Sequence, residues 1–154
     1  MEKEWIKINN LEEIRIDFTE KVVLLENKSG SRTLAHVILD ARGNHKLRGY
    51  NKNSLKKYKI LAYYKIAEWE FCLIPFGTEM KLPKGSTEQN CEAYTLWGTR
   101  HGGMLPVEHQ IVRVVNGHPY FCTGWYGAGH PDYLLGYHIL PDMYLFEPEG
   151  TSGL

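Results

Sequence analysis

The chain has 154 residues, of which 43% are hydrophobic and 23% are charged, and its net charge is zero. This length matches one ordinary domain, and this composition excludes a chain that stays disordered through low hydrophobicity or excess charge. We therefore expect a single domain over residues 1–154.

The expected location follows from two absences in the sequence. No apolar run approaches the roughly 20 residues that a membrane-spanning helix needs, and the acidic start at residues 1–5 lacks the positive region of a secretory signal. Cys72, Cys91 and Cys122 are an odd number of cysteines at wide spacing, which argues against a disulfide framework. We expect a cytoplasmic protein with reduced thiols and no membrane association.

Segments rich in β-branched and aliphatic residues dominate the first half of the chain and favour strands. They are Trp5–Ile8, Val22–Glu26, Thr33–Leu39, Tyr58–Ile66 and Trp69–Pro75. The turn residues 27–31 predict a hairpin between the second and third of these segments. Asn10 followed by Glu13 predicts a capped helical turn. Residues 51–54 either close a loop or cap a helical turn at Leu55–Lys57.

In the second half, residues 81–90 have neither a helical nor a strand period, so we expect an exposed connection there. The strand-like residues 110–115 and 118–125 flank Asn116 and Gly117, the pair that a two-residue hairpin turn favours. Strands are also expected at Tyr133–Ile139 and Met143–Phe146. Residues 147–154 are expected to form a frayed tail.

These elements predict a mostly β fold. We expect an antiparallel sheet, as a compact barrel or a two-layer arrangement, with one or two short helices. Exposed strand edges need covering, so a homo-oligomer is also expected. Residues 58–71 resemble residues 133–146 weakly, which either two similar β-meanders or chance would produce.

Two glycine-rich segments, residues 97–103 and 124–130, combine aromatic rings, basic side chains and permissive backbone. Rings can stack on a base, and exposed amides with an arginine can bind phosphate. We therefore expect a non-enzymatic binding protein that sequesters an anionic small molecule such as a nucleotide signal. The candidate ligand-binding residues are Trp97, Arg100, His101, Gly102, Gly103, Trp125, Tyr126, Gly127 and His130. Connecting loops without a ligand are the alternative interpretation.

The stretch from residue 42 to residue 65 contains eight basic residues and no acidic one, interspersed with tyrosines. This pattern fits a surface that binds and inhibits a host protein, because aromatic residues and arginine are favoured at interfaces. The candidate contact residues are Arg48, Tyr50, Lys57, Tyr63 and Tyr64. Nucleic acid is a less favoured partner, since the isoelectric point is only about 7.1. A solvated strand face would show the same pattern.

A zinc- or histidine-dependent hydrolase is the third function considered. The histidines of the second half, among them His101, His109 and His130, are too widely spaced for a typical zinc motif. Cys91 or Cys122 beside a histidine would supply a nucleophile, but no nucleophile-elbow motif is present. We therefore expect no bound metal, no cofactor and no catalysis.

The order of Trp5, the strand at residues 22–25, and a tyrosine-rich strand closing at Trp69 and Pro75 resembles small β-rich bacteriophage proteins of unknown function. The resemblance covers about half the chain. It implies an accessory protein that sequesters a host signal or blocks a host defence factor, acting in the host cytoplasm.

Overall fold

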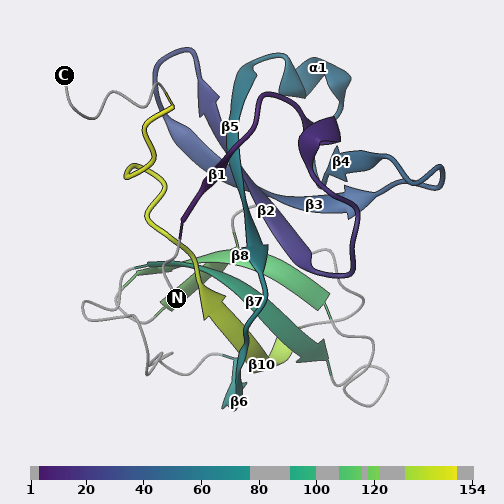
Figure 1. The fold of residues 1–154 in the computed structure, drawn as a ribbon. Helices are drawn as coiled ribbons and strands as arrows, with labels where there is room; N and C mark the ends of the chain where they lie inside the picture. The colour runs from purple at the N-terminus through teal and green to yellow at the C-terminus, as the bar shows by residue number, and fades with distance from the viewer. Residues whose placement is uncertain (1–3, 77–90, 100–107, 116–117, 122–130, 149–154) are drawn as a thin grey trace. The chain divides into compact units, whose positions relative to one another are not determined.

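The computed structural model describes residues 4–76, 91–99, 108–115, 118–121 and 131–148 (Figure 1). The chain forms two compact units. Unit 1 contains residues 1–67 and 141–154, and unit 2 contains residues 68–140. Each unit has its own sheet and its own hydrophobic core. The expectation that the whole chain is one domain stays a prediction.

The sheet of unit 1 is antiparallel, with the strand order β1-β5-β2-β3-β4 (Figure 1). Its strands are β1 Ile6–Lys7, β2 Glu20–Asn27, β3 Arg32–Leu39, β4 His45–Leu47 and β5 Tyr58–Ile66. The four strands predicted in this part of the chain are confirmed. The sequence did not predict β4, because three residues are too few to show a strand period.

Two short helical segments accompany this sheet, η1 Leu11–Glu13 and α1 Lys52–Leu55. As predicted, the amide of Asn10 donates a hydrogen bond to Glu13 Oε2 at 2.9 Å. At α1, the amide of Ser54 donates to Asn51 Oδ1, and the amide of Asn51 donates to Ser54 Oγ, both at 2.8 Å. Asn51 therefore caps a helical turn, which decides between the two alternatives, but the turn is Lys52–Leu55 and not residues 55–57.

The sheet of unit 2 is also antiparallel, with the strand order β6-β10-β7-β8-β9. Its strands are β6 Glu70–Pro75, β7 Cys91–Thr99, β8 Glu108–Val115, β9 His118–Phe121 and β10 Pro131–Ile139. The predicted hairpin is confirmed, because Val115 pairs directly with His118. Its turn residues, and the connection predicted at residues 81–90, lie outside the described residues. The sequence did not predict β7, whose residues 93–95 are all buried and show no alternation.

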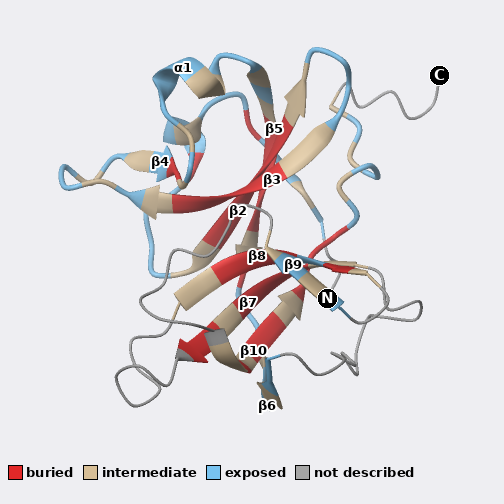
Figure 2. Cartoon of the chain, turned by 180° about the vertical axis from the view of Figure 1, so that it is seen from behind, coloured by how far each residue is buried: buried red, intermediate tan, exposed pale blue. Residues whose placement is uncertain are grey.

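The fold is thus mostly β and antiparallel, as predicted, and it includes the expected short helices. Buried residues concentrate on the central strands of each sheet (Figure 2). Within the described residues neither sheet closes into a barrel, because its two outer strands are paired on one side only. In this part of the chain, neither helical segment has the length and apolarity of a membrane-spanning helix.

The two sheets have the same arrangement. Adding five to each strand number of unit 1 gives the order of unit 2. The match extends to the register between the last strand and the second strand of each unit. Leu24 pairs with Ala62 in unit 1, and Leu96 pairs with Gly136 in unit 2. The first part of the weak sequence similarity, at residues 58–66 and 133–139, therefore falls on two strands, β5 and β10, that occupy the same place. Its second part, residues 67–71 against 141–146, does not fall on corresponding elements.

A β-bulge marks the same position in both strands. In unit 1 the next pair is Leu25 with Ile60, so β5 has one extra residue, Leu61. In unit 2 the next pair is Trp97 with Leu134, so β10 likewise has one extra residue, Leu135. The sequences around the two bulges are Ile-Leu-Ala-Tyr and Leu-Leu-Gly-Tyr. The pairing therefore assigns each strand residue of unit 1 a counterpart in unit 2.

The cores of the two units follow this correspondence. Residues at matched positions belong to the core of unit 1 or of unit 2, or pack against it. These pairs are Ile8 with Cys72, Leu25 with Trp97, Val37 with Val112, Leu47 with Phe121, Ile60 with Leu134 and Tyr63 with Tyr137. The same five-stranded arrangement is thus built twice, with different side chains at most of these matched positions.

The strand predicted at residues 143–146 is wrong, because this segment is a turn. Asp142 Oδ1 accepts a hydrogen bond from the Tyr144 amide at 2.8 Å, and the Leu145 amide donates to the Asp142 carbonyl at 3.2 Å. The carbonyls of Met143 and Phe146 accept from Arg32 Nη1 at 2.6 and 2.8 Å. One arginine side chain thus binds two backbone carbonyls that a neighbouring strand would bind if this segment were a strand.

Gly136 tests the correspondence between the units, since its counterpart is the buried Ala62. A Cβ at Gly136 would lie 3.4 Å from the Glu70 carbonyl oxygen and 3.6 Å from the Phe71 and Trp69 rings, which are ordinary contacts. Gly136→Ala should therefore raise the free energy of unfolding by up to about 1 kcal/mol, because alanine loses less backbone entropy on folding. The measurement is a urea titration.

The matched control is Gly30→Ala, which should lower the free energy of unfolding by about 1–2 kcal/mol, because φ is +89° at Gly30. If Gly136→Ala were destabilising to the same extent, β10 would not tolerate the residue that β5 carries.

Candidate functional site

The candidate site is a shallow pocket at one end of the unit 1 sheet, with a volume of about 560 Å³. This volume is within the range of roughly 300–1,000 Å³ that ligand pockets occupy. We call it the lysine pocket. Six residues line it: Asn27, Lys28, Ser29, Lys56, Lys57 and Tyr58.

The pairing of β2 with β5 brings the two sides of the pocket together. The last pair of this register is Asn27 with Tyr58. The turn after β2 carries Lys28, and the turn before β5 carries Lys56 and Lys57. Residues almost 30 positions apart in the sequence therefore line one pocket.

Local hydrogen bonds hold the first turn. Asn27 Oδ1 accepts hydrogen bonds from the amides of Ser29 and Ser31 at 3.0 and 2.9 Å. The Ser29 hydroxyl donates to the same oxygen at 2.7 Å. The Asn27 amide donates to the Ser31 carbonyl at 2.9 Å, and Gly30 supplies the positive φ that this turn requires. Lys28 therefore projects from a well-defined backbone.

The second turn is equally well bonded. Besides the reciprocal cap between Asn51 and Ser54, the Leu55 amide donates to the Asn51 carbonyl at 2.9 Å. The Lys57 amide donates to the Ser54 carbonyl at 3.2 Å. Tyr58, which follows, packs edge-on against Tyr50 with ring centroids 5.6 Å apart. Both lysines of this turn are thus attached to an ordered backbone.

Within the part of the chain that the structure describes, the positive charge of the pocket has no acidic partner. Lys28, Lys56 and Lys57 are exposed, and none forms an ion pair within the described residues. Elsewhere in unit 1 some lysines pair with carboxylates, as in Lys46 with Asp40 at 3.7 Å. Three like charges around one hollow create a local positive potential that attracts anions. The arrangement can bind a phosphate or carboxylate group.

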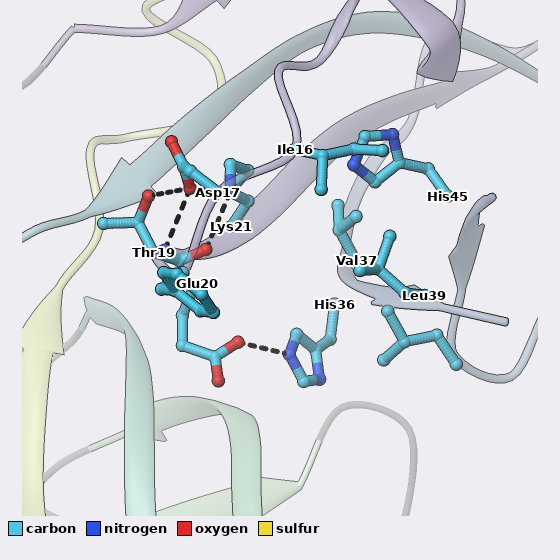
Figure 3. A pocket seen from close by; sticks show the side chains of 11 residues that line it. Ile16, Asp17, Thr19, Glu20, Lys21, His36, Val37, Leu39 and His45 are labelled. Atoms are coloured by element: carbon cyan, nitrogen blue, oxygen red, sulfur yellow. Dashed lines mark hydrogen bonds and ion pairs between the residues drawn. The ribbon is translucent and has the colours of Figure 1, made fainter. Parts of the chain in front are cut away.

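A second pocket of unit 1 has a different charge pattern (Figure 3). It has a volume of about 300 Å³ and lies beside the start of β2 and the end of β3. His36 Nε2 lies 3.1 Å from Glu20 Oε2, and a dashed line joins them in Figure 3. The exposed apolar residues Ile16, Phe18 and Leu39 also line it. We call it the histidine pocket.

Asp17 is a second acidic residue of the histidine pocket, besides Glu20. Its carboxylate contacts the ammonium groups of Lys21 and Lys65, the second at 3.0 Å, and accepts from the Thr19 hydroxyl and amide. The Lys21 ammonium, followed by the Thr19 hydroxyl and then Lys65, holds the pKa of Asp17 well below its usual range. Since the basic groups here have carboxylate partners, this pocket is less suited to an anion than the lysine pocket.

The predicted ligand-binding residues fall mostly outside the described residues. These are Arg100, His101, Gly102, Gly103, Trp125, Tyr126, Gly127 and His130. Trp97 is described, and it is buried in the core of unit 2, only 1% exposed. Its indole N–H donates to Thr95 Oγ1 at 2.7 Å, and its ring packs edge-on against Phe76 and Phe121. In this position it stabilises the core and presents no face for stacking.

One described feature concerns the two glycine-rich segments together. Thr99, the last residue of β7, pairs with Pro131, the first residue of β10. One segment begins within β7 and the other ends immediately before β10. The end of β7 and the start of β10, to which these segments are attached, therefore lie side by side at one end of the sheet. This end corresponds to the end of the unit 1 sheet that carries the lysine pocket.

The predicted protein-contact residues do not form one surface. Lys57 is exposed, and Arg48 and Tyr50 are half-buried. Tyr63 belongs to the core of unit 1 and is 8% exposed, while Tyr64 is 9% exposed and packs edge-on against Trp5 at 6.0 Å. Of the five residues, only Lys57 lines the lysine pocket.

The described residues contain no group of three histidine, cysteine, aspartate or glutamate side chains that could hold a metal ion. His109 stacks on Tyr94 with ring centroids 5.7 Å apart, and His138 Nδ1 lies 2.7 Å from the Glu68 carbonyl oxygen. Burial raises the pKa of the Cys72 thiol, which disfavours a reactive thiolate. His101, His130 and Cys122 are outside the described part of the chain.

No protein-family model, curated protein or solved structure matches this chain.

Asp17→Asn tests the electrostatics of the histidine pocket. The substitution removes the countercharge of Lys21, whose side chain is only 4% exposed, so Tm at pH 7 should fall. The folded-state pKa of Asp17 is depressed, so its stabilisation is present above the ordinary carboxyl pKa near 4 and is lost as the pH falls further. The Tm difference from wild type should therefore shrink below about pH 4, as circular dichroism would measure.

Glu12→Gln is the matched control, because Glu12 is exposed and its carboxylate forms no ion pair within the described ranges. Its Tm should stay within about 1 °C of wild type at every pH. A Tm difference for Asp17→Asn that is independent of pH would contradict the assigned role of the carboxylate.

Proposed function

We propose that this chain is a non-enzymatic binding protein that holds an anionic small molecule in the lysine pocket of unit 1. The observation that carries the proposal is the convergence of Lys28, Lys56 and Lys57 on one hollow, without a carboxylate partner in the described residues. Lysine ammonium groups bind phosphate strongly as compact point charges. The ligand class is a phosphorylated small molecule such as a nucleotide.

The rigidity of the two turns favours an anion-binding site over the alternative, a basic surface that contacts only water. Each turn is fixed by an asparagine side chain, Asn27 on one side and Asn51 on the other. Binding a ligand costs conformational entropy when the chain around it must become ordered. Lysines on an already ordered backbone lose less of this entropy than lysines on a mobile loop would lose. The ligand therefore meets a preformed group of cations.

The corresponding end of unit 2 supports the same function. The pairing of Thr99 with Pro131 attaches both glycine-rich segments there, and those segments carry the arginine and histidines predicted to bind phosphate. That prediction is consistent with anion binding at corresponding ends of the two sheets. The resemblance to bacteriophage proteins implies sequestration of a host signal. Sequestration requires binding alone and no catalytic step.

Inhibition of a host protein receives less support. The two tyrosines at the centre of that prediction, Tyr63 and Tyr64, are buried in unit 1 and would contribute little area to an interface. Hydrolysis receives none from the described residues, which bring no metal ligands or activated nucleophile together.

The test replaces Lys28, Lys56 and Lys57 with glutamine in the full chain and measures binding by calorimetry. The panel contains inorganic phosphate, pyrophosphate, and nucleoside mono- and triphosphates. At least one polyphosphate should bind the wild type, and the triple variant should bind it about 10- to 100-fold more weakly, because each of the three exposed charge pairs contributes up to about 1 kcal/mol and 1.4 kcal/mol is tenfold. Affinity should also fall with added salt.

The matched control removes three other exposed basic groups, Lys7, Arg15 and Arg42, in the same way. It has the same net charge as the test variant and should bind like the wild type. If nothing in the panel binds, or if both triple variants lose affinity equally, the lysine pocket is not the site.

A further inference from the structure

The lysine pocket contains an aromatic ring besides its charges. Of the six described residues that line the pocket, Tyr58 is the one with a ring, and it is the first residue of β5. The volume of about 560 Å³ is typical of pockets that hold whole organic ligands, so a phosphate group alone would leave much of the hollow filled with water. The pocket can therefore hold a second chemical group beside the phosphate.

Tyr58 is held in a fixed position. The strand pairing with Asn27 fixes its backbone, and its half-buried side chain packs against the core of unit 1. Tyr50 meets its ring edge-on, with an angle of 87° between the two ring planes. Within the described residues Tyr50 is the one ring in contact with Tyr58. An aromatic side chain that is already ordered offers a stacking surface at a small cost in conformational entropy.

The lysines of the pocket are the closest neighbours of Tyr58 in the chain and across the strand pairing. Lys57 directly precedes Tyr58, and Lys28 directly follows Asn27, the residue with which Tyr58 pairs. The ring and the positive charges therefore belong to one small region of unit 1. A ligand that carries a ring and several phosphates can use both.

We propose that the lysine pocket is specific for nucleotides, with the base stacked on Tyr58 and the phosphates bound by the three lysines. This inference rests on the proposed function and adds the residue that distinguishes a nucleotide from other polyanions. Stacking on an aromatic side chain uses the face that every base has, so it selects for a ring and tolerates different bases. Tyr58 therefore determines specificity for the ring, while the lysines determine affinity for the charge.

The test compares two ligands with the full chain by calorimetry, adenosine triphosphate and inorganic tripolyphosphate. Tripolyphosphate carries at least as much negative charge but no base, so charge alone would not make it the weaker ligand. The wild type should bind adenosine triphosphate about tenfold more tightly than tripolyphosphate, because one base stacked on an aromatic side chain contributes roughly this factor or more.

Two substitutions separate the ring from the charge. Tyr58→Leu should weaken the binding of adenosine triphosphate about tenfold and leave the binding of tripolyphosphate unchanged, because leucine removes the ring and keeps an apolar side chain against the core. Tyr58→Phe, which restores the ring, should recover the affinity. Lys28→Gln should weaken the binding of both ligands by the same factor. Unchanged binding of tripolyphosphate also shows that the Tyr58→Leu variant is folded.

The control is Tyr120→Leu, because Tyr120 is 60% exposed and lies in unit 2. This variant should bind both ligands like the wild type. The inference is overturned, while the proposed function stands, if the wild type binds both ligands equally or if Tyr58→Leu weakens both equally. If neither ligand binds, or if Lys28→Gln affects neither, the proposed function fails and the inference fails with it.

Discussion

Both sheets depend on the pairing between the last strand of each unit and its second strand. Three elements, β3, β4 and α1, lie between β2 and β5 in the chain. β5 nevertheless pairs with β2 along its whole length, and it also pairs with β1. β10 does the same with β7 and β6. Such non-local pairing orders a long stretch of chain at a substantial entropic cost. Burial of the central strands offsets that cost, and Val22, Val23, Leu24 and Leu25 are all fully buried.

This pairing also creates the chemistry of the lysine pocket. A register that ends at Asn27 and Tyr58 places two turns beside each other, and each turn carries lysine. Neither turn has an unusual sequence by itself. The potential arises because their cations share one hollow while, within the described residues, Asp17, Glu26 and Asp40 pair with basic groups elsewhere. The lysine pocket is thus a consequence of register.

The segment after unit 2 shows how tertiary contacts override local preference. Residues 143–146 include aromatic and aliphatic side chains that favour a strand. Arg32, which is 10% exposed, binds two of their carbonyls, contacts Glu26 at 2.9 Å and lies over the Tyr144 ring. The Trp5 indole also donates to the Asp142 carbonyl at 3.2 Å. These contacts give the backbone carbonyls hydrogen-bond donors without strand pairing. The donors lie more than 100 residues away in the chain, so no local sequence pattern could reveal them.

The sequence by itself determined the fold class, most strands, the Asn116–Gly117 hairpin and the cap at Asn10, because these depend on side-chain alternation and on contacts within a few residues. It also located the basic stretch that contains Lys56 and Lys57. Only the tertiary structure decided which strands are neighbours, that one arrangement occurs twice, and that Lys28 joins the other two lysines. It also placed Trp97 and Tyr63 in the cores. The physical reason is that strand periodicity shows which side chains share a face, whereas burial and neighbourhood depend on pairing between residues far apart in the chain.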